Sequence, residues 1–293
     1  MTLPKSVSEI VPGMLYAIGG CLPADIPFSI FPRGFSGFLP IQCYAWCNGG
    51  DMLIIDTGIG CHIAQILEGL DYVRELHKPK RIRLLFSRRE SDNIINFPVI
   101  NERYPLEAVY CFGDIDPYDF FIVFDNASAE SIIQSTSGRK LEVINASKEF
   151  TIGDLHINLV RTTLKLLTTF WVYEPVSKTM LTSDTFAFLT QEQDGPVAIT
   201  RSTDGMNVDA MMKYLEVKFD WLIETDTSEL VRDMQRIADS YEIHRLCPCM
   251  GQIIEGTEAV KNAFATAIQA LKQMQKTKRV SQLTGLDLRK LSA

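Results

Sequence analysis

The stretch MLIIDTG (residues 52–58) places four apolar residues directly before an acidic residue and a glycine turn. A short apolar run that ends in polar and glycine residues is typical of a buried β-strand followed by a loop. Upstream, NGGD (residues 48–51) is a turn signal between this run and a second apolar stretch at residues 41–46. The segment therefore predicts a β-hairpin whose second strand delivers Asp56 to a loop.

The pattern beyond this hairpin changes from strand to helix and back to strand. Helical spacing relates Ile63, Ile66, Leu67 and Leu70, and the next apolar run, residues 82–86, ends in the polar cluster SRRESDN at 87–93. Loops at the ends of rigid strands are where α/β proteins hold functional side chains. The cluster at 87–93 is therefore a candidate site.

The rest of the chain supplies strands for a second sheet and helices to cover it. Residues 170–173 and 179–182 flank a turn and form a hairpin that ends in Ser183-Asp184. Helices are expected at 208–219 and 228–241, before a short strand at 245–247 and the loop PCMG at 248–251. Four further runs are assigned to the second sheet: 108–112, 120–124, 141–144 and 157–160. The resulting fold class is α/β.

Composition limits the partners of the chain. Its 293 residues include 46% hydrophobic and 22% charged residues, which is typical of one main globular domain. The formal net charge of −7 disfavours binding to nucleic acid or to anionic membranes. No apolar run approaches the roughly 20 residues that span a bilayer, and the first residues lack a secretory pattern. We expect a cytoplasmic protein whose seven cysteines are mostly reduced core thiols.

In order and spacing, four of these segments resemble the metallo-β-lactamase superfamily, and most of all the diiron domain of flavodiiron proteins and oxygen-binding diiron sensors. The resemblance covers roughly residues 10–255, and its markers are MLIIDTG, FSRRESDN (86–93), FWVYEPVSKTMLTSDTF (170–186) and LCPCMG (246–251). It implies an αββα sandwich of two mixed sheets with outer helices, formed by residues 1–256, plus a C-terminal helix.

The resemblance also implies positions for metal ligands, and this chain departs from them. In the diiron branch the first loop carries His-x-Glu-x-Asp, a second histidine precedes the hairpin, an aspartate ends it, and a third histidine lies in the late loop. Many superfamily members have a further histidine directly after the first loop's aspartate. The corresponding residues here, in chain order, are Arg88, Glu90, Asp92, Asn93, Lys165, Asp184 and Met250.

These substitutions oppose metal binding. Arginine and protonated lysine offer no lone pair and carry positive charge, and a thioether is a poor ligand for iron or zinc. None of the four histidines (62, 77, 156 and 244) lies on a marker loop. We therefore expect no cofactor, and we predict that Arg88 or Lys165 forms an ion pair with a retained carboxylate. The alternatives are a solvent-exposed loop whose charges have drifted, and a weakly bound divalent metal at Glu90, Asp92 and Asp184.

The C-terminal part divides into a helix and a short tail. At residues 257–279, apolar positions at Val260, Phe264, Ala267, Leu271 and Met274 have coiled-coil spacing, which fits either a dimerising helix or packing against the domain. The tail, 280–293, contains LTGL (283–286) and resembles the opening of a GGDEF diguanylate cyclase domain; chance is the alternative. This pattern leads us to expect a homodimer and a C-terminal signalling domain.

Together these features predict a noncatalytic sensory or regulatory domain with an unidentified small-molecule ligand. The alternative is an enzyme of altered site: a metal-dependent hydrolase or an oxygen-binding diiron protein. Cys249 is the one nucleophile in the late loop, but no histidine is near it in sequence, so a buried thiol is the preferred interpretation.

Overall fold

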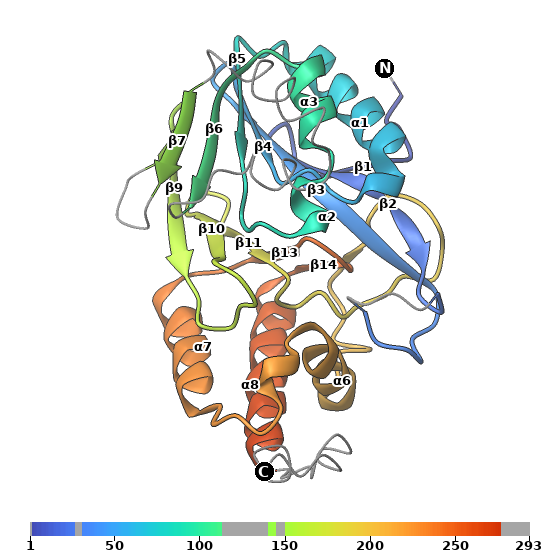
Figure 1. The fold of residues 1–293 in the computed structure, drawn as a ribbon, viewed down its shortest axis with the longest axis vertical. Helices are drawn as coiled ribbons and strands as arrows, with labels where there is room; N and C mark the ends of the chain where they lie inside the picture. Colours follow the sequence, from blue (N-terminus) through green and yellow to red (C-terminus); the bar gives the residue numbers. More distant parts are fainter. Residues whose placement is uncertain (1, 27–30, 113–139, 145–149, 277–293) are drawn as a thin grey trace, which may run out of the picture.

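The computed structural model describes residues 2–26, 31–112, 140–144 and 150–276. In these residues the chain forms two seven-stranded sheets. Helices α1, α2 and α3 lie over the first sheet, and α6, α7 and α8 lie over the second, so that the order of layers is helix, sheet, sheet, helix (Figure 1). The predicted α/β class and the αββα sandwich are confirmed.

The first sheet keeps the order of the sequence, from β1 to β7. Pairing is antiparallel from β1 to β4 and parallel from β4 to β7, so the sheet is mixed. Its strands are β1 (Val7–Val11), β2 (Leu15–Pro23), β3 (Phe38–Asn48), β4 (Asp51–Ile55), β5 (Arg81–Leu85), β6 (Leu106–Phe112) and β7 (Lys140–Ile144).

The turn between β3 and β4 is the hairpin that the sequence predicts. Asn48 pairs with Asp51, so only Gly49 and Gly50 lie in the loop, with φ of 57° and 85°. A two-residue hairpin with two positive φ angles follows the twist of the strands, and glycine adopts that conformation without steric cost.

The second sheet has the order β12-β14-β13-β11-β10-β9-β8. Strand β11 pairs with β10 in antiparallel fashion and with β13 in parallel. The strands are β8 (Phe150–Ile152), β9 (Leu155–Arg161), β10 (Phe170–Glu174), β11 (Thr179–Ser183), β12 (Ile199–Thr200), β13 (Arg245–Pro248) and β14 (Ile253–Glu255).

Two strands that the sequence assigns to the second sheet belong to the first. The runs at 108–112 and 141–144 form β6 and β7, which extend the parallel part of the first sheet beyond β5. The residue pattern of a strand indicates whether the strand is buried, but it does not indicate which strand pairs with it. Pairing is decided by contacts with residues far away in the sequence. The run at 157–160 lies in β9, as predicted, and 120–124 falls outside the described residues.

Four helices of the described residues overlap the predicted ones, and the two short helices within residues 91–103 were not predicted. The helices are α1 (Ile63–His77), α2 (Ser91–Ile94), α3 (Phe97–Arg103), α6 (Val208–Lys218), α7 (Ser228–Ser240) and α8 (Thr257–Lys276), with short 3-10 turns η1 (Gly60–His62) and η2 (Asp220–Leu222). Among the helices of the described residues, none combines the length and the apolar character that a membrane crossing requires.

Three hydrophobic clusters fill the spaces between adjacent layers. One joins α1 and α3 to the first sheet, for example through Ile66 and Phe97, and a second lies between the sheets around Trp46 and Val172. The third joins the second sheet to α6, α7 and α8 around Trp171. Burial of these apolar side chains on both faces of each sheet is the main force that stabilises the arrangement.

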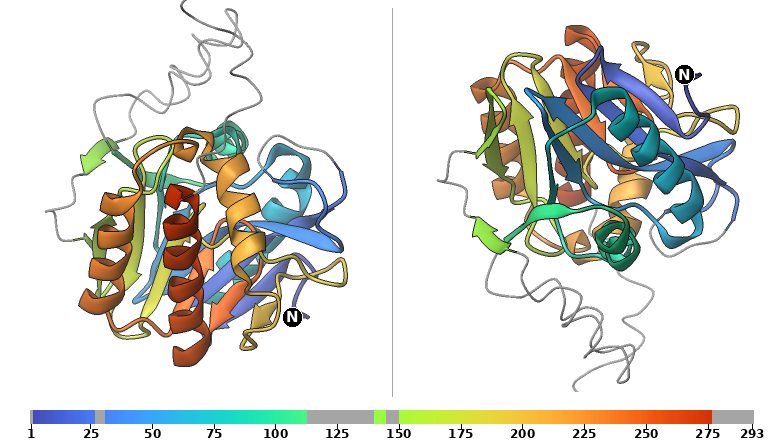
Figure 2. Two further views of the ribbon diagram at one scale, coloured as in Figure 1. Left: turned by 90° about the horizontal axis from the view of Figure 1, so that it is seen from below. Right: turned by 90° about the horizontal axis from the view of Figure 1, so that it is seen from above.

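The C-terminal helix α8 belongs to the third cluster. All five positions of its coiled-coil-like spacing are buried: Val260, Phe264, Ala267, Leu271 and Met274. Viewed from below, α8 lies across the second sheet between α7 and α6 (Figure 2). The apolar stripe therefore packs within the chain, which is the second of the two alternatives for this helix. The tail at 280–293 lies outside the described residues.

Candidate functional site

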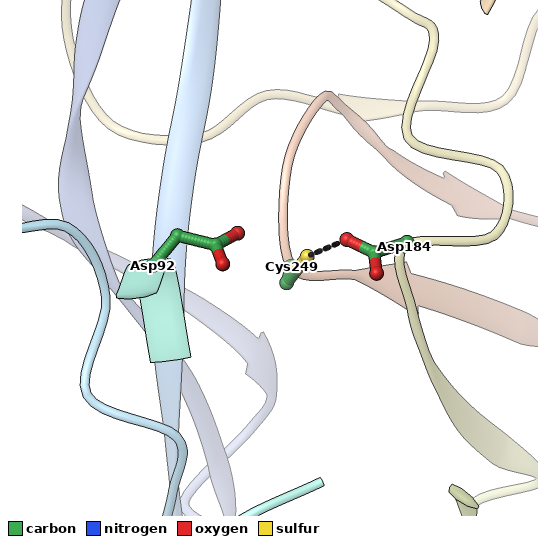
Figure 3. A group of neighbouring side chains, drawn as sticks. All are labelled: Asp92, Asp184 and Cys249. Atoms are coloured by element: carbon green, nitrogen blue, oxygen red, sulfur yellow. Dashed lines mark hydrogen bonds between the residues drawn. The ribbon is translucent and has the colours of Figure 1, made fainter. Parts of the chain in front are cut away.

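Polar residues that follow the ends of three strands meet between the two sheets. Strand β5 ends before the loop that carries Arg88, β11 before Asp184, and β13 before Cys249. Because β4 runs parallel to β5, and β11 to β13, the carboxyl ends within each pair lie at the same edge. Ligand-type atoms of Asp92, Asp184 and Cys249 lie within 4.8 Å of one another. Figure 3 shows the two carboxylates turned toward each other, with the Cys249 sulfur beside Asp184.

The guanidinium of Arg88 lies among these three groups. Its Nη2 is 2.8 Å from Oδ1 of Asp184 and forms a short hydrogen bond with Oδ2 of Asp92. Its Nε lies 3.2 Å from Oε1 of Glu90. The Arg88 side chain is 0% exposed, so this cation is compensated by the carboxylates and not by water. The predicted ion pair between Arg88 and the retained carboxylates is confirmed.

The other terminal nitrogen of Arg88 points to two neutral groups. Nη1 donates to Oγ of Ser183 at 3.0 Å and to Sγ of Cys249 at 3.4 Å. The Cys249 thiol in turn donates to Oδ1 of Asp184 at 3.4 Å. Burial raises the pKa of Cys249 well above its ordinary value, although Arg88 opposes the shift. Cys249 is therefore a protonated hydrogen-bonding group here and a poor nucleophile.

The second cation of the site is Lys218, the last residue of α6, which we did not predict. Its Nζ donates to Oε2 of Glu90 at 2.6 Å and lies 3.2 Å from Oδ1 of Asp184. The side chain is only 2% exposed. A sequence signal existed, because Lys218 follows Met211, Tyr214 and Leu215 at helical spacing, on the face of α6 that is buried.

Lys165, the other cation considered for an ion pair with the retained carboxylates, does not form one in the described residues. It is exposed on the connection between β9 and β10, and in the described residues the ion pairs of Glu90, Asp92 and Asp184 are made by Arg88 and Lys218. Alternate residues of this connection, Thr162 and Leu164, are buried. Lys165 directly follows Leu164, and its side chain therefore turns to the opposite side.

Charge in the site is nearly balanced. The carboxylates of Glu90, Asp92 and Asp184 face the cations of Arg88 and Lys218, which leaves a formal charge of −1 if all five are ionised. Burial alone would raise the pKa of Glu90, but Arg88 and Lys218 outweigh it and lower that pKa. Asp184 is more deeply buried, and burial raises its pKa to about 6 even though both cations oppose the shift.

The cations respond to the same carboxylates. Burial would lower the pKa of Lys218, but Asp184, Asp92 and Glu90 together outweigh it, so the pKa lies above its ordinary value. The pKa of Arg88 is raised in the same way, with Asp184 as the main opposing influence to burial. Both side chains therefore remain charged in the folded protein.

Asp56, from the segment MLIIDTG, holds the loop of Arg88 in place through hydrogen bonds with Ser87. Its Oδ1 accepts a hydrogen bond from the backbone N–H of Ser87 at 2.8 Å, and its Oδ2 accepts from Oγ of Ser87 at 2.6 Å. Asp56 has φ of 60°, and Ser183 has φ of 53°. Each such conformation costs on the order of 1 kcal/mol or more in a non-glycine residue, and the surrounding hydrogen bonds hold it in place.

Asn93 is fully buried next to this support. Its backbone carbonyl accepts from the N–H of Thr57 at 2.7 Å and from Oγ1 of the same residue at 2.5 Å. Its side-chain Nδ2 lies 3.5 Å from Oγ of Ser87. Asn93 therefore joins the loop after β4 to the loop after β5.

The late loop is held by the first sheet. Gln42 Nε2 donates to the carbonyls of Pro248 at 2.7 Å and Gly251 at 3.1 Å, and the Tyr44 hydroxyl donates to Pro248 at 2.6 Å. Met250 is completely buried in the core between the second sheet and its helices. Its thioether is thus a packing group.

The four histidines lie away from the candidate ligands. His62 is buried in η1, and His77 ends α1 with Nε2 2.8 Å from the Tyr16 hydroxyl. His156 is exposed in β9, and His244 precedes β13. Within the part of the chain that the structure describes, the group of potential metal ligands contains no histidine.

The residues present do not fit a diiron centre of the kind that the resemblance implies. The space among Asp92, Asp184 and Cys249 contains the guanidinium of Arg88, which contacts all three. A cation at that position repels a metal ion, and it uses the carboxylate oxygens that would coordinate one. The arrangement is that of a buried ion-pair cluster.

Comparison with known proteins supports the fold. No protein-family model and no curated protein matches the sequence. Solved structures do match: the flavodiiron protein from Giardia intestinalis has 16% sequence identity and a TM-score of 0.61, over 92% of this chain and 59% of that one. The metal-soaked Flv1 flavodiiron core from Synechocystis sp. PCC6803 has 9% identity and a TM-score of 0.65, over 91% and 60%.

A second group of matches consists of metallo-β-lactamases. VMB-1 has 13% identity and a TM-score of 0.54, over 92% of this chain and 99% of that one. The chain therefore has a metallo-β-lactamase fold close to the diiron domain of flavodiiron proteins, as the sequence resemblance implies. It spans about three fifths of the length of the flavodiiron chains that it matches.

Proposed function

We propose that this chain is a noncatalytic sensory or regulatory domain with a metallo-β-lactamase fold, in which Arg88 and Lys218 take the place of metal ions. The observation that carries the proposal is the fully buried guanidinium of Arg88 between Asp92 and Asp184. Hydrolases of this fold use metal to polarise the substrate and to activate water. Arginine supplies neither a coordination site nor an ionisable water.

The other groups of the site favour the same conclusion. Cys249 is a buried thiol whose pKa is raised by burial, and no histidine lies among the candidate ligands in the described residues. A nucleophile and a neighbouring base are the minimum for covalent catalysis. A sensory or regulatory role instead requires a stable fold and a ligand or partner, which this scaffold can provide.

Metal content tests the proposal directly. Purified protein, expressed in medium supplemented with iron, zinc and manganese, should contain each metal at well below one ion per chain by elemental analysis. Finding about two tightly held ions per chain, lost in Asp184→Ala, would overturn the proposal and favour the alternative of an enzyme or oxygen-binding protein. The exposed Asp204→Ala variant provides the control for nonspecific metal.

A matched substitution makes the test sharper. Arg88→His removes the cation and supplies an imidazole beside Asp92 and Asp184. If Arg88 is what prevents binding, this variant should take up more metal than the wild type. Equal metal content in the two proteins, at a high level, would contradict the role given to Arg88.

A further inference from the structure

A pocket lies between α7 and α8, where α7 ends and α8 begins, and none of the residues of the ion-pair cluster lines it. Its volume is about 560 Å³. The walls are the C-terminal half of α7, the connection at 241–244 and the first three turns of α8. Pockets of about 300–1,000 Å³ are the usual size for small-molecule sites.

The pocket has a visible cause in the sequence. Ala238 on α7 and Ala265 on α8 both line it, and their short side chains leave space between the two helices. At the opposite end the helices are tied together by hydrogen bonds. Thr227 Oγ1 donates to the carbonyl of Leu271 at 2.7 Å, and Gln275 Nε2 donates to Asp226 at 3.0 Å. The pair is thus closed at one end and hollow at the other.

The chemistry of the pocket favours an uncharged, mainly apolar ligand. Its floor includes Val260, Phe264 and Ile268 of α8. Its charged residues are the pairs Lys178 with Lys261 and Asp239 with Glu242, so their formal charges cancel. Lys178 and Glu242 already form an ion pair of 2.5 Å, and Asp239 accepts from Gln235 at 3.0 Å.

We propose that this pocket binds a small, uncharged molecule with an apolar body and one hydrogen-bonding group. The apolar body would cover the floor formed by Val260, Phe264 and Ile268, and the polar group would face the charged residues that line the pocket. The regulatory meaning of such binding rests on the proposed sensory function, because only a sensory role would make the contact of a ligand with α7 and α8 a signal. Binding itself is independent of the metal content of the site.

Two related dyes test the proposal. Phenylnaphthylamine is uncharged, has one N–H group, and fluoresces more strongly when it leaves water. Anilinonaphthalene sulfonate differs by an anionic group. In a titration of the full chain, phenylnaphthylamine should bind saturably with one site per chain, and more tightly than the sulfonate. Absence of saturable binding, or equal binding of the sulfonate, would overturn the proposed ligand class.

Substitutions that fill the pocket locate the binding. Ala265→Leu and Ala238→Leu, one on each helix, should each weaken dye binding by about tenfold or more, because the added side chain occupies the site. Ala210→Leu on α6 is the matched control and should leave binding unchanged. Circular dichroism shows whether each variant is folded, and two variants on separate helices guard against the loss of one. Unchanged binding in folded filled variants would overturn the site.

The two proposals can fail separately. If Ala265→Leu abolishes dye binding and the protein also holds a full complement of metal, the pocket proposal stands and the proposed metal-free function is overturned. A metal-free protein that does not bind the dye would overturn the pocket proposal and leave the proposed metal-free function standing.

Discussion

At the residue scale, Arg88 does what a simpler cation could not. Its planar guanidinium directs separate nitrogens to different partners: Nη2 to Asp92 and Asp184, Nε toward Glu90, and Nη1 to Ser183. A lysine ammonium has one nitrogen and cannot reach partners spread around a plane. Arginine also keeps its charge when buried, so the carboxylates stay compensated.

Removing this cation should be costly. Arg88→Met keeps much of the side-chain volume but leaves Asp92 and Asp184 facing each other without their main partner. We expect a loss of about 3–5 kcal/mol in the free energy of unfolding, measured by urea titration. Lys165→Met, at the exposed lysine that the sequence also suggested, should change it by no more than about 0.5 kcal/mol. A wild-type-like Arg88→Met protein would refute the ion-pair cluster.

Asp184 should make stability depend on pH. Its pKa is raised from 3.8 to about 6 in the folded state. Between these values the folded protein holds a proton that the unfolded chain releases, so this contribution is full below about pH 4 and is lost as pH rises through about 6. Glu90 acts in the opposite sense, because its folded pKa is lowered.

The comparison with Asp184→Asn isolates this contribution. The unfolding free energy of the wild type minus that of the variant should fall between about pH 4 and pH 6 and level off above. Urea titrations across this range provide the measurement. A difference that rises with pH would show that Asp184 has a lowered pKa in the folded protein.

At the scale of single elements, α6 and α8 show what helical periodicity can and cannot reveal. On α6, the spacing of Met211, Tyr214, Leu215 and Lys218 places a lysine on the buried face, and a buried lysine requires a carboxylate partner. That signal identifies Lys218 as a candidate site residue. The family pattern instead points to Lys165, because the second histidine of the diiron branch precedes the hairpin, but Lys165 is exposed here.

On α8 the apolar stripe has spacing that serves a coiled coil and a domain core equally well. The structure buries Leu271 against the domain, and we expect Leu271→Ala to lower the free energy of unfolding by about 2–5 kcal/mol without changing the oligomeric state. Urea titration and sedimentation velocity measure the two quantities. Gln269→Ala, at an exposed position of the same helix, is the control. Dissociation of a dimer in Leu271→Ala would return the stripe to an intermolecular role.

At the scale of the whole molecule, the central strands and the long helices were predictable, whereas β1, β2, α2 and α3 were not predicted. The assignment of strands to sheets was only partly correct. The turn at Gly49-Gly50 and the strand ends at Asp56 and Asp184 carry local signals that a sequence pattern records. Strand β6 joins the first sheet by pairing with β5, and β7 joins it by pairing with β6; no local pattern encodes either contact.

The site followed the same division. Arg88, Glu90 and Asp92 lie within five consecutive residues, from the end of a loop into α2, so their proximity was predictable from spacing. Asp184 and Cys249 come from the second sheet, and the resemblance supplied Asp184. Lys218 comes from a helix that the family pattern does not mention. Homodimerisation and a C-terminal signalling domain stay predictions.

The buried guanidinium of Arg88 also bears on how the stability of the domain depends on the supply of metal. A metal ion stabilises a protein only in proportion to the logarithm of its free concentration, so a metalloprotein weakens when a cell is starved of metal or when a chelator is added. Arg88 is attached to the backbone, and its local concentration beside Asp92 and Asp184 cannot be diluted. On our proposal, the domain completes its fold from the polypeptide alone, and its stability is the same in metal-rich and in metal-poor surroundings.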